Sequence, residues 1–482
     1  MNEHLRKVEE LQVQLRRGMG PVALRYRKGH SNTTRTKVYK NGLRQLDCGA
    51  FDEILAIDPA KRVAIVEPRV TMEALAQATL PLGLRAPVIP EFKGITVGGA
   101  IMGGGAESSS HQHGIFSDAC LALTMICGDG SLLRTSATES PDIFYGLSGS
   151  YGSLGALVSA EIRLVPAKDS VLLLHRVFSD PAEAVRQIQA RIHAVDAPEF
   201  IEGMIFAKDH AVVIEGRSVA KVDVPDHLPR SSLQSPQAEW YWQHVKSASS
   251  DFYEETMPLE DYLFRHDRGA FWMGAYLFHL PLLARIAFEG ILGIGKGSSQ
   301  GFSDEEVRAF CRLPSPGAFL RALSSPLLSS QRLWGIFHKA EKWLQQRVLV
   351  QDFCIPESHA ARFLQQVLQD PGTFPIWLCP IQGTRNPQIF APHLLNENSP
   401  DRHFINVGIY GLPSYYAPIE QITKRLENLT HSFGGRKVLY SRSYYSPEQF
   451  WRIYNYDAYD DLRTKTHAKG IWHDITEKVL SA

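Results

Sequence analysis

Glycine is concentrated in one short stretch, and this stretch constrains the fold more than any other feature of the chain. Six glycines lie between Gly94 and Gly105. Ordering glycine costs more conformational entropy than ordering any other residue. Such a run makes sense where the backbone must approach a flat or charged ligand through its N–H groups, or in a tightly packed turn. No Gly-x-Gly-x-x-Gly sits here between a strand and a helix, so it is not the dinucleotide fingerprint.

The overall composition narrows the function. The chain has 482 residues, with 51 basic and 51 acidic side chains and 44% hydrophobic residues. This is globular composition, and the absence of a basic excess argues against nucleic acid as a partner. The six cysteines form no Cys-x-x-Cys pair, which is typical of buried thiols in a reducing compartment.

The N-terminal residues do not look like a targeting signal. Leu5, Val8, Leu11 and Leu15 recur at helical spacing among charged residues, which predicts an amphipathic helix rather than a signal peptide. No run of about 18 apolar residues occurs, so no transmembrane helix is expected. We expect a cytoplasmic protein, soluble or peripherally attached to a membrane.

Periodicity predicts both helices and strands. The β-branched runs 54–58 and 62–68 read as a strand pair, and a helix follows Thr71. Residues 121–127 and 132–135 flank a Gly-Asp-Gly hairpin signal, and 156–165 is a further strand. Later, an alternating segment that ends at Pro356 precedes a predicted helix over 357–369. The chain should therefore be an α+β protein.

Three segments, in this order and spacing, resemble the FAD-binding domain of the vanillyl-alcohol-oxidase/PCMH flavoprotein superfamily. The first is the loop 27–31, the second joins 96–99 to 108–114, and the third runs from Asp142 to Val158. Within that superfamily the chain is most similar to the delta-24 sterol reductase (Diminuto/seladin) branch. The residues behind this likeness lie in 92–99, 107–111, 160–163, 166–168, 350–352 and 375–380.

The resemblance implies a two-domain architecture. Residues 1–175 would form the PCMH-type FAD-binding domain, residues 176–430 an α/β substrate (cap) domain, and residues 431–482 a C-terminal segment that returns to the FAD domain. In such folds the first loop and the glycine run bind the FAD pyrophosphate through backbone N–H groups. The expected cofactor-binding residues are Arg27, Lys28, Gly29, His30, Ser31, Asn32, Thr96, Val97, Gly98, Gly99, Ser108, Ser109, Ser110, His111, Gly114, Gly155, Val158 and Asn455.

Two further inferences concern histidines. His30 matches the position that some superfamily members attach covalently to the flavin, so a covalent link there is one alternative to noncovalent binding. His111 and His113 alternate, so on a strand both would face one side. We expect no metal, because no third ligand is placed by the sequence and the family uses none. His113 and Tyr454 are the candidates for the catalytic proton donor.

The charge-free stretch 271–284 leaves three interpretations open. It could be core, it could line a pocket for a hydrophobic substrate, or it could form an apolar surface that contacts a membrane. Pro281 argues against one long helix.

By resemblance, the protein is an FAD-dependent oxidoreductase that reduces a C=C bond of a sterol-like or isoprenoid side chain, with NADPH as donor and hydride transfer from flavin N5. One alternative is an FAD-linked oxidase or dehydrogenase of a sugar, alditol or polyprenyl-phosphate sugar, which a covalent His30 would favour. A second is a flavin-binding protein without turnover. The oligomeric state stays open.

Overall fold

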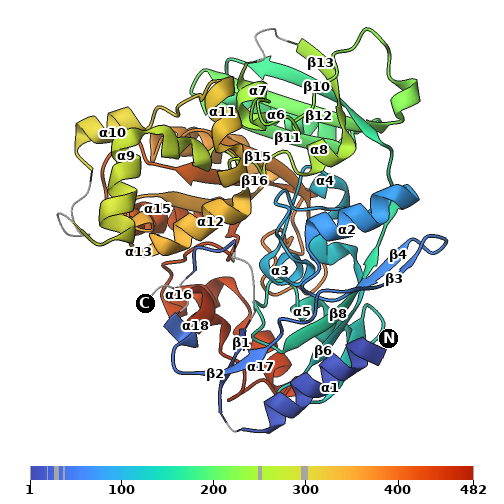
Figure 1. Ribbon diagram of the computed structural model, residues 1–482. Helices are drawn as coiled ribbons and strands as arrows, with labels where there is room; N and C mark the ends of the chain where they lie inside the picture. Colours follow the sequence, from blue (N-terminus) through green and yellow to red (C-terminus); the bar gives the residue numbers. More distant parts are fainter. Residues whose placement is uncertain are drawn as a thin grey trace.

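Two β-sheets organise the protein in the computed structural model, one in each half of the molecule (Figure 1). The structure describes residues 2–18, 20–25, 32–35, 38–247, 252–294 and 302–480. Runs of strands and runs of helices are mixed along the chain, and the strands of both large sheets pair antiparallel, which confirms the α+β prediction.

The first sheet is antiparallel and has five strands in the order β3-β4-β8-β6-β7. The predicted strand pair and the predicted hairpin are both part of it. Its strands are β3 (Ile54–Asp58), β4 (Val63–Val66), β8 (Ala156–Arg163), β6 (Cys120–Ile126) and β7 (Leu132–Ser136).

The second sheet has eight strands in the order β13-β10-β12-β11-β15-β16-β14-β17. It begins at Ser170, before the expected boundary at 175, and its last strand lies beyond 430. Its strands are β10 (Ser170–Phe178), β11 (Phe200–Ala207), β12 (His210–Val219), β13 (Phe252–Pro258), β14 (Leu349–Pro356), β15 (Ile376–Gln382), β16 (His403–Gly411) and β17 (Arg436–Lys437).

The two faces of this large sheet have different neighbours, because successive side chains of a strand point to opposite faces. On one face, α6 (Pro181–Ile192), α14 (Glu357–Gln369) and α15 (Ile419–Ser432) bury apolar residues against the strands. Helix α14 has the bounds predicted from the sequence. The other face contributes side chains such as Trp377 and Tyr410 to a second core that it shares with the first domain.

Segments from the N-terminal and C-terminal parts of the chain pack together beside the first sheet. Helix α1 (Asn2–Arg16) buries Val8, Leu11 and Leu15, as its periodicity predicts, although Leu5 stays exposed. A short parallel pair, β1 (Val22–Arg25) and β2 (Arg44–Asp47), lies next to Trp472. The C-terminal helices gather there (Figure 1); they are α16 (Pro447–Ile453), α17 (Tyr456–Lys465) and α18 (Ile475–Val479).

Short helices connect these parts. In the first half they are α2 (Met72–Thr79), α3 (Val97–Gly103), α4 (Ser110–His113) and α5 (Pro141–Gly146). In the second half they include α7 (Tyr241–Lys246), α8 (Leu259–Leu263), η5 (Met273–Phe278), α9 (Leu280–Arg285), η6 (Ile286–Ile291), α10 (Asp304–Phe310), α11 (Ala318–Ser324), α12 (Ser330–Lys339) and α13 (Glu341–Leu344).

The charge-free stretch 271–284 divides at His279. Phe271, Trp272 and Tyr276 are buried. Of the three interpretations, the membrane-facing surface is therefore excluded for this first part. The exposed apolar residues begin at Leu280 and continue past Arg285 to Ile294. Within the described chain, no helix combines the length and apolarity needed to span a bilayer.

Candidate functional site

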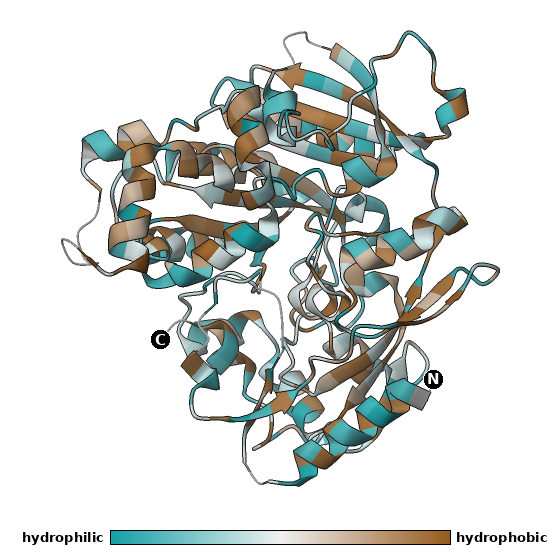
Figure 2. Ribbon diagram, in the orientation of Figure 1, coloured by the Kyte–Doolittle hydropathy of each residue, from teal (hydrophilic) through white to brown (hydrophobic). Residues whose placement is uncertain are grey.

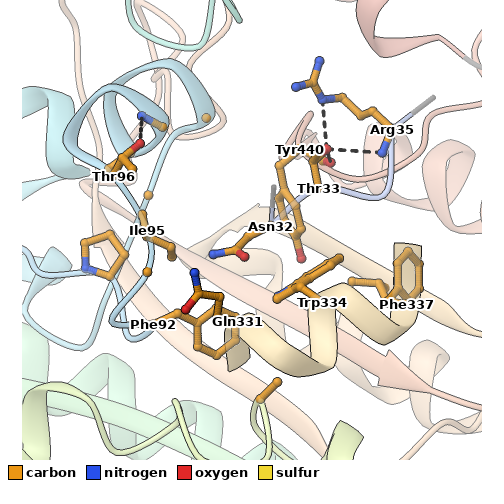
Figure 3. Close-up of a pocket in the computed structure, with 18 of the residues that line it drawn as sticks. Asn32, Thr33, Arg35, Phe92, Ile95, Thr96, Gln331, Trp334, Phe337 and Tyr440 are labelled. Carbon is orange, nitrogen blue, oxygen red and sulfur yellow. Dashed lines mark hydrogen bonds between the residues drawn. The ribbon is translucent and has the colours of Figure 1, made fainter. Parts of the chain in front are cut away.

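A cavity of about 1090 Å³ is lined by residues of both halves of the molecule. One wall comes from the glycine-rich segment, β1 and the C-terminal helix α18. The opposite wall comes from η5, α12 and the strands β14 to β16. Figure 3 shows Ile95 and Thr96 on one side of this space and Trp334 and Phe337 of α12 on the other, with Tyr440 next to Trp334. The cavity is large enough for a cofactor and a substrate to lie side by side, since ligand pockets of about 300–1,000 Å³ are typical.

The glycine-rich segment begins helix α3 and does not form a loop whose backbone amides converge on an anion. Thr96 caps α3, and its Oγ1 accepts a hydrogen bond of 3.1 Å from the Gly99 amide. The Gly98 amide donates to the carbonyl of Pro68 at 2.8 Å. Both amides that were expected to bind the pyrophosphate are thus already used within the fold. The wall contributes shape instead: Thr96, Gly98 and Gly99 line the cavity, whereas Val97 faces the core.

Glycine is needed at Gly98 because of its close approach to Pro68. A Cβ at this position would lie 2.8 Å from the Pro68 Cβ. Gly94, in contrast, would place a Cβ in open space, since nothing lies within 4 Å of it. Gly94 also lines the cavity, so the absence of a side chain there leaves room for a ligand.

Two cations, the half-buried Arg35 and the buried Lys478, mark one end of the cavity. Arg35 lies over the Tyr151 ring, 4.1 Å from its centroid, and donates to the Lys478 carbonyl at 3.1 Å. The Lys478 ammonium donates to the carbonyls of Tyr151 and Gly152 at 3.2 and 2.7 Å. Among the described residues, no carboxylate forms an ion pair with either cation. Burial lowers the pKa of Arg35, and burial together with the charge of Arg35 lowers the pKa of Lys478 to about 7.

This arrangement fits the pyrophosphate of FAD. Burying a cation without a counter-charge is costly, and an anionic ligand would remove that cost through charge-assisted hydrogen bonds. Arg35 and Lys478 were not among the residues expected from the sequence. Only the three-dimensional structure brings Arg35 and Lys478 together, because 443 positions separate them along the chain.

The first predicted loop is only partly described. Arg27, Lys28, Gly29, His30 and Ser31 lie outside the described residues. Asn32, the next residue, lines the cavity. Gly155 also lines it, as expected, and has no room for a side chain because a Cβ would meet Met125 and Ile126.

The segment 108–114 is helical, not extended, and it supports the wall from behind. The alternation of His111 and His113 therefore does not place them on one face of a strand. The His111 ring lies within hydrogen-bond distance of the carbonyls of Ser108 and Pro198, and burial lowers the pKa of His111 to about 4. None of the expected residues of this segment lines the cavity; they are Ser108, Ser109, Ser110, His111, His113 and Gly114.

Hydrogen bonds explain why these serines are buried. The Ser109 hydroxyl donates to the Pro87 carbonyl at 2.8 Å, and Ser110 Oγ accepts from the Glu107 amide at 2.9 Å. Ser108 Oγ accepts from the Tyr262 hydroxyl at 3.1 Å. The segment thus connects the first domain to the second.

His113 belongs to the same segment, and burial lowers its pKa to about 4. A role for His113 as proton donor to a ligand in the cavity has no geometric support.

The expected C-terminal site residues are also elsewhere. Tyr454 is 2% exposed and packs on Phe450 with ring centroids 4.6 Å apart. Asn455 caps helix α17 by accepting a hydrogen bond from the Ala458 amide. Val158 belongs to the core beneath α1. None of the three lines the cavity, so Tyr454 is a core aromatic and not an active-site acid.

A carboxylate with three donors lies where β14 meets the cavity. The Asp352 carboxylate accepts hydrogen bonds from Asn406 at 2.6 Å, Tyr410 at 2.8 Å and Tyr440 at 2.6 Å. All four residues line the cavity. Burial nevertheless raises the pKa of Asp352. In the sequence, Asp352 is noticeable as an aspartate within a predicted strand. The sequence could not identify the three residues that donate to it.

A buried ion-pair network lies close to this carboxylate. Arg265 donates to Glu202 at 2.7 Å and also to Glu107. Glu202 accepts further hydrogen bonds from Tyr241 at 3.0 Å and from Trp377 at 2.8 Å. The charge of Arg265 holds the pKa of Glu202 below its usual range against the opposing effect of burial. One cation therefore serves two buried carboxyls.

Aromatic and aliphatic side chains line the part of the cavity that faces these groups. Trp334 and Phe337 come from α12, and Gln331 is the polar residue beside them (Figure 3). The apolar lining is completed by Phe92, Phe271, Met273, Leu277, Leu282, Ile286, Trp377 and Leu412. Such a lining fits an apolar ring or chain and excludes water.

Comparison with known proteins bears on both halves of the cavity. Residues 20–136 match the family model described as an FAD binding domain. The chain is 28% identical over 490 residues to the Delta(24)-sterol reductases of Macaca fascicularis and Homo sapiens, covering 99% of this chain and 87% of theirs. It is 27% identical over 457 residues to the Delta(24)-sterol reductase of Arabidopsis thaliana, covering 90% of this chain and 76% of that protein.

The likeness to these reductases spans both sheets, and the matched FAD-binding segment contains Asn32, Arg35 and the glycine-rich wall of the cavity. With its two-domain α+β fold, the chain is thus an FAD-dependent oxidoreductase of the PCMH type that is similar, over nearly its whole length, to the Delta(24)-sterol reductases.

Proposed function

We propose that the protein reduces a carbon–carbon double bond in the side chain of a sterol or a similar isoprenoid, with NADPH as the electron donor. The observation that carries this proposal is the two-ended cavity. The two cations at one end suit the pyrophosphate of FAD, and the aromatic lining at the other end suits an apolar substrate. The names of the relatives support the same substrate class.

In this proposal, the residues of the chain bind the cofactor and the substrate, orient them and shield them from water. Arg35 and Lys478 hold the pyrophosphate, and the wall from Gly94 to Gly99 leaves space for the cofactor. Trp334 and the other aromatic side chains of the lining hold the substrate and keep water out. Bound there, FAD would supply the hydride-transfer chemistry between the nicotinamide and the alkene.

We also propose that the segment from Leu280 to Ile294 contacts a lipid surface, from which an apolar substrate would enter. Leu282 and Ile286 face inward and line the cavity. The outward side chains are exposed, and much of the segment is brown in Figure 2. They are Leu280 (75%), Leu283 (37%), Phe288 (55%), Ile291 (43%), Leu292 (59%) and Ile294 (60%). A single thin layer of helix therefore separates an apolar surface from an apolar cavity.

Flavin spectroscopy tests the function. The purified protein should be yellow, acid precipitation should release the FAD, and NADPH should bleach it without oxygen. A sterol with a side-chain double bond should then restore the oxidised spectrum. Bleaching by NADPH with no reoxidation by any such alkene would contradict the proposal.

The same experiment separates the alternatives. Flavin that stays in the acid pellet would indicate a covalent bond, with His30 as the attachment site, and would favour an oxidase of a sugar or alditol. Flavin that no donor bleaches would favour a binding protein without turnover.

A further inference from the structure

Glu91 differs from the neighbouring carboxyls because, among the described residues, only its own backbone amide donates to it. Glu91 is half-buried and lines the cavity. Within the described part of the chain, no other residue hydrogen-bonds to its carboxyl or pairs with it. Phe92, the next residue, belongs to the apolar lining of the cavity.

The neighbouring carboxyls are occupied. Glu202 has Arg265, Tyr241 and Trp377 as donors, and Asp352 has its three donors from β16 and Tyr440. Glu107 receives Arg265 on one oxygen, although its second oxygen has no hydrogen-bond partner. Lys437, the next cation, is paired with Glu427 at 2.8 Å.

The charge balance makes at least one carboxyl retain its proton. Among the described residues, the carboxyls of Glu91, Glu107, Glu202 and Asp352 interact electrostatically, and Arg265 is the cation that pairs with two of them. His266 adds no charge, because burial lowers its pKa to about 4. Burying several unpaired negative charges together is prohibitive.

Of the four carboxyls, Glu91 gives up the fewest hydrogen bonds and ion pairs when it is protonated. Burial and the repulsion of Glu107 raise the pKa of Glu91 to about 8, although its own backbone amide and the charge of Arg265 oppose this shift. Asp352 of β14 repels it as well. The remaining titratable groups that face it are Tyr410, Tyr440 and Cys379, all with a raised pKa and therefore neutral.

We propose that Glu91 is the catalytic acid that protonates the alkene. This inference rests on the proposed function, because it assigns the proton that the reduction needs. An isolated C=C bond has no carbonyl to stabilise a carbanion, so hydride addition requires a proton donor in contact with the alkene. A neutral carboxylic acid that opens into an apolar cavity is such a donor.

The step balances with the groups named. The O–H bond of Glu91 and the C=C π bond break, and a C–H bond forms on one alkene carbon. The other alkene carbon gains the hydride that originates from the reduced nicotinamide, which forms the second new C–H bond of the step. The Glu91 carboxylate then regains a proton from water, so one NADPH and one proton are consumed for each double bond.

The test separates the two halves of turnover in the FAD-loaded protein. Glu91→Gln keeps the size and polarity of the side chain but removes the acidic proton. It should retain bound FAD and should be bleached by NADPH at the wild-type rate. Reoxidation by the alkene should slow by about 100-fold or more. Glu183→Gln, in the exposed part of α6, is the matched control and should change neither rate.

A second readout does not depend on turnover. At neutral pH the infrared spectrum of the wild type should contain a protonated-carboxyl band that Glu91→Gln lacks. The alkene-dependent rate of the wild type should fall as the pH rises above about 8, and Glu91→Gln should lose this dependence.

The outcomes are distinguishable. A wild-type protein that reduces no alkene would sink the proposed function, and the inference with it. An active wild type together with equally fast reoxidation in Glu91→Gln, or with no carboxyl band that the substitution removes, would overturn the role of Glu91 alone.

Discussion

The Tyr440 hydroxyl donates a 2.6 Å hydrogen bond to Asp352, and this bond joins the start of the C-terminal segment to the middle of strand β14. Both residues line the cavity. Because 88 positions separate them along the chain, the contact fixes how the last part of the chain closes over the second sheet.

Tyr440→Phe tests the contribution of this bond to stability. The substitution leaves one oxygen of a buried carboxylate without its donor, so the free energy of unfolding should fall by about 1–3 kcal/mol. Chemical denaturation of the FAD-free protein measures the change. Tyr416→Phe, at a 47% exposed site, is the control and should stay within about 0.5 kcal/mol of the wild type. Equal stability of the two variants would contradict the prediction.

Lys478→Met should weaken FAD binding and remove its pH dependence. In the FAD-free protein the pKa of Lys478 is about 7, and an anionic ligand favours the protonated form. Affinity should therefore be greatest below pH 7 and should fall, by at most about tenfold per pH unit, as the pH rises above 7.

Fluorescence titration with FAD at several pH values measures the effect. In Lys478→Met the Kd should be higher by about tenfold or more at pH 6, with a flat profile above pH 7. Lys469→Met removes an ammonium that is exposed and paired with Asp460, and it should leave the Kd unchanged. A wild-type profile in Lys478→Met would show that this cation does not meet the cofactor.

Glu202→Ala should destabilise the fold strongly. It leaves the buried Arg265 guanidinium with half of its counter-charge, and breaking a buried pair costs about 3–5 kcal/mol. Arg265 holds the pKa of Glu202 below that of the unfolded chain. The contribution is therefore present above the unfolded-chain pKa of 4.5 and is lost as the pH falls below it.

Thermal unfolding over pH 3–7 checks this prediction. The difference in Tm between the wild type and Glu202→Ala should narrow toward acid pH. Glu139→Gln, which removes an exposed charge beside Arg134, should shift the Tm little at any pH. A difference that does not change with pH would show that packing, and not charge, makes the contribution.

Leu292→Glu should reduce binding to lipid vesicles. It places a charge in the exposed segment 280–294, and burying a charge in a membrane interface is unfavourable. Vesicle flotation measures the bound fraction. Val222→Glu introduces the same charge at a 91% exposed site outside this segment and should have no effect. Equal flotation of both variants, or none for the wild type, would exclude the segment as a docking surface.

Local pattern was sufficient for much of the fold. The β-branched runs 54–58 and 62–68 predicted the β3–β4 pair, helical spacing predicted the buried face of α1, and the helix expected over 357–369 is α14. These elements follow from neighbours within a few positions, which is the range that local pattern reports. The glycine run alone left a ligand contact and a packed turn both open, and FAD was expected from the resemblance of three segments to a flavoprotein superfamily.

The tertiary structure alone decided which polar residues meet in the cavity. Asp352 lies far along the chain from Glu91 and Glu107, and the pairing of Arg265 with two carboxyls depends on the packing of both domains. It also placed Tyr454 and His111 in the protein interior, where the sequence suggested a site. Burial and proximity shift a pKa and create an acid, and both are set by long-range packing, which no local pattern contains.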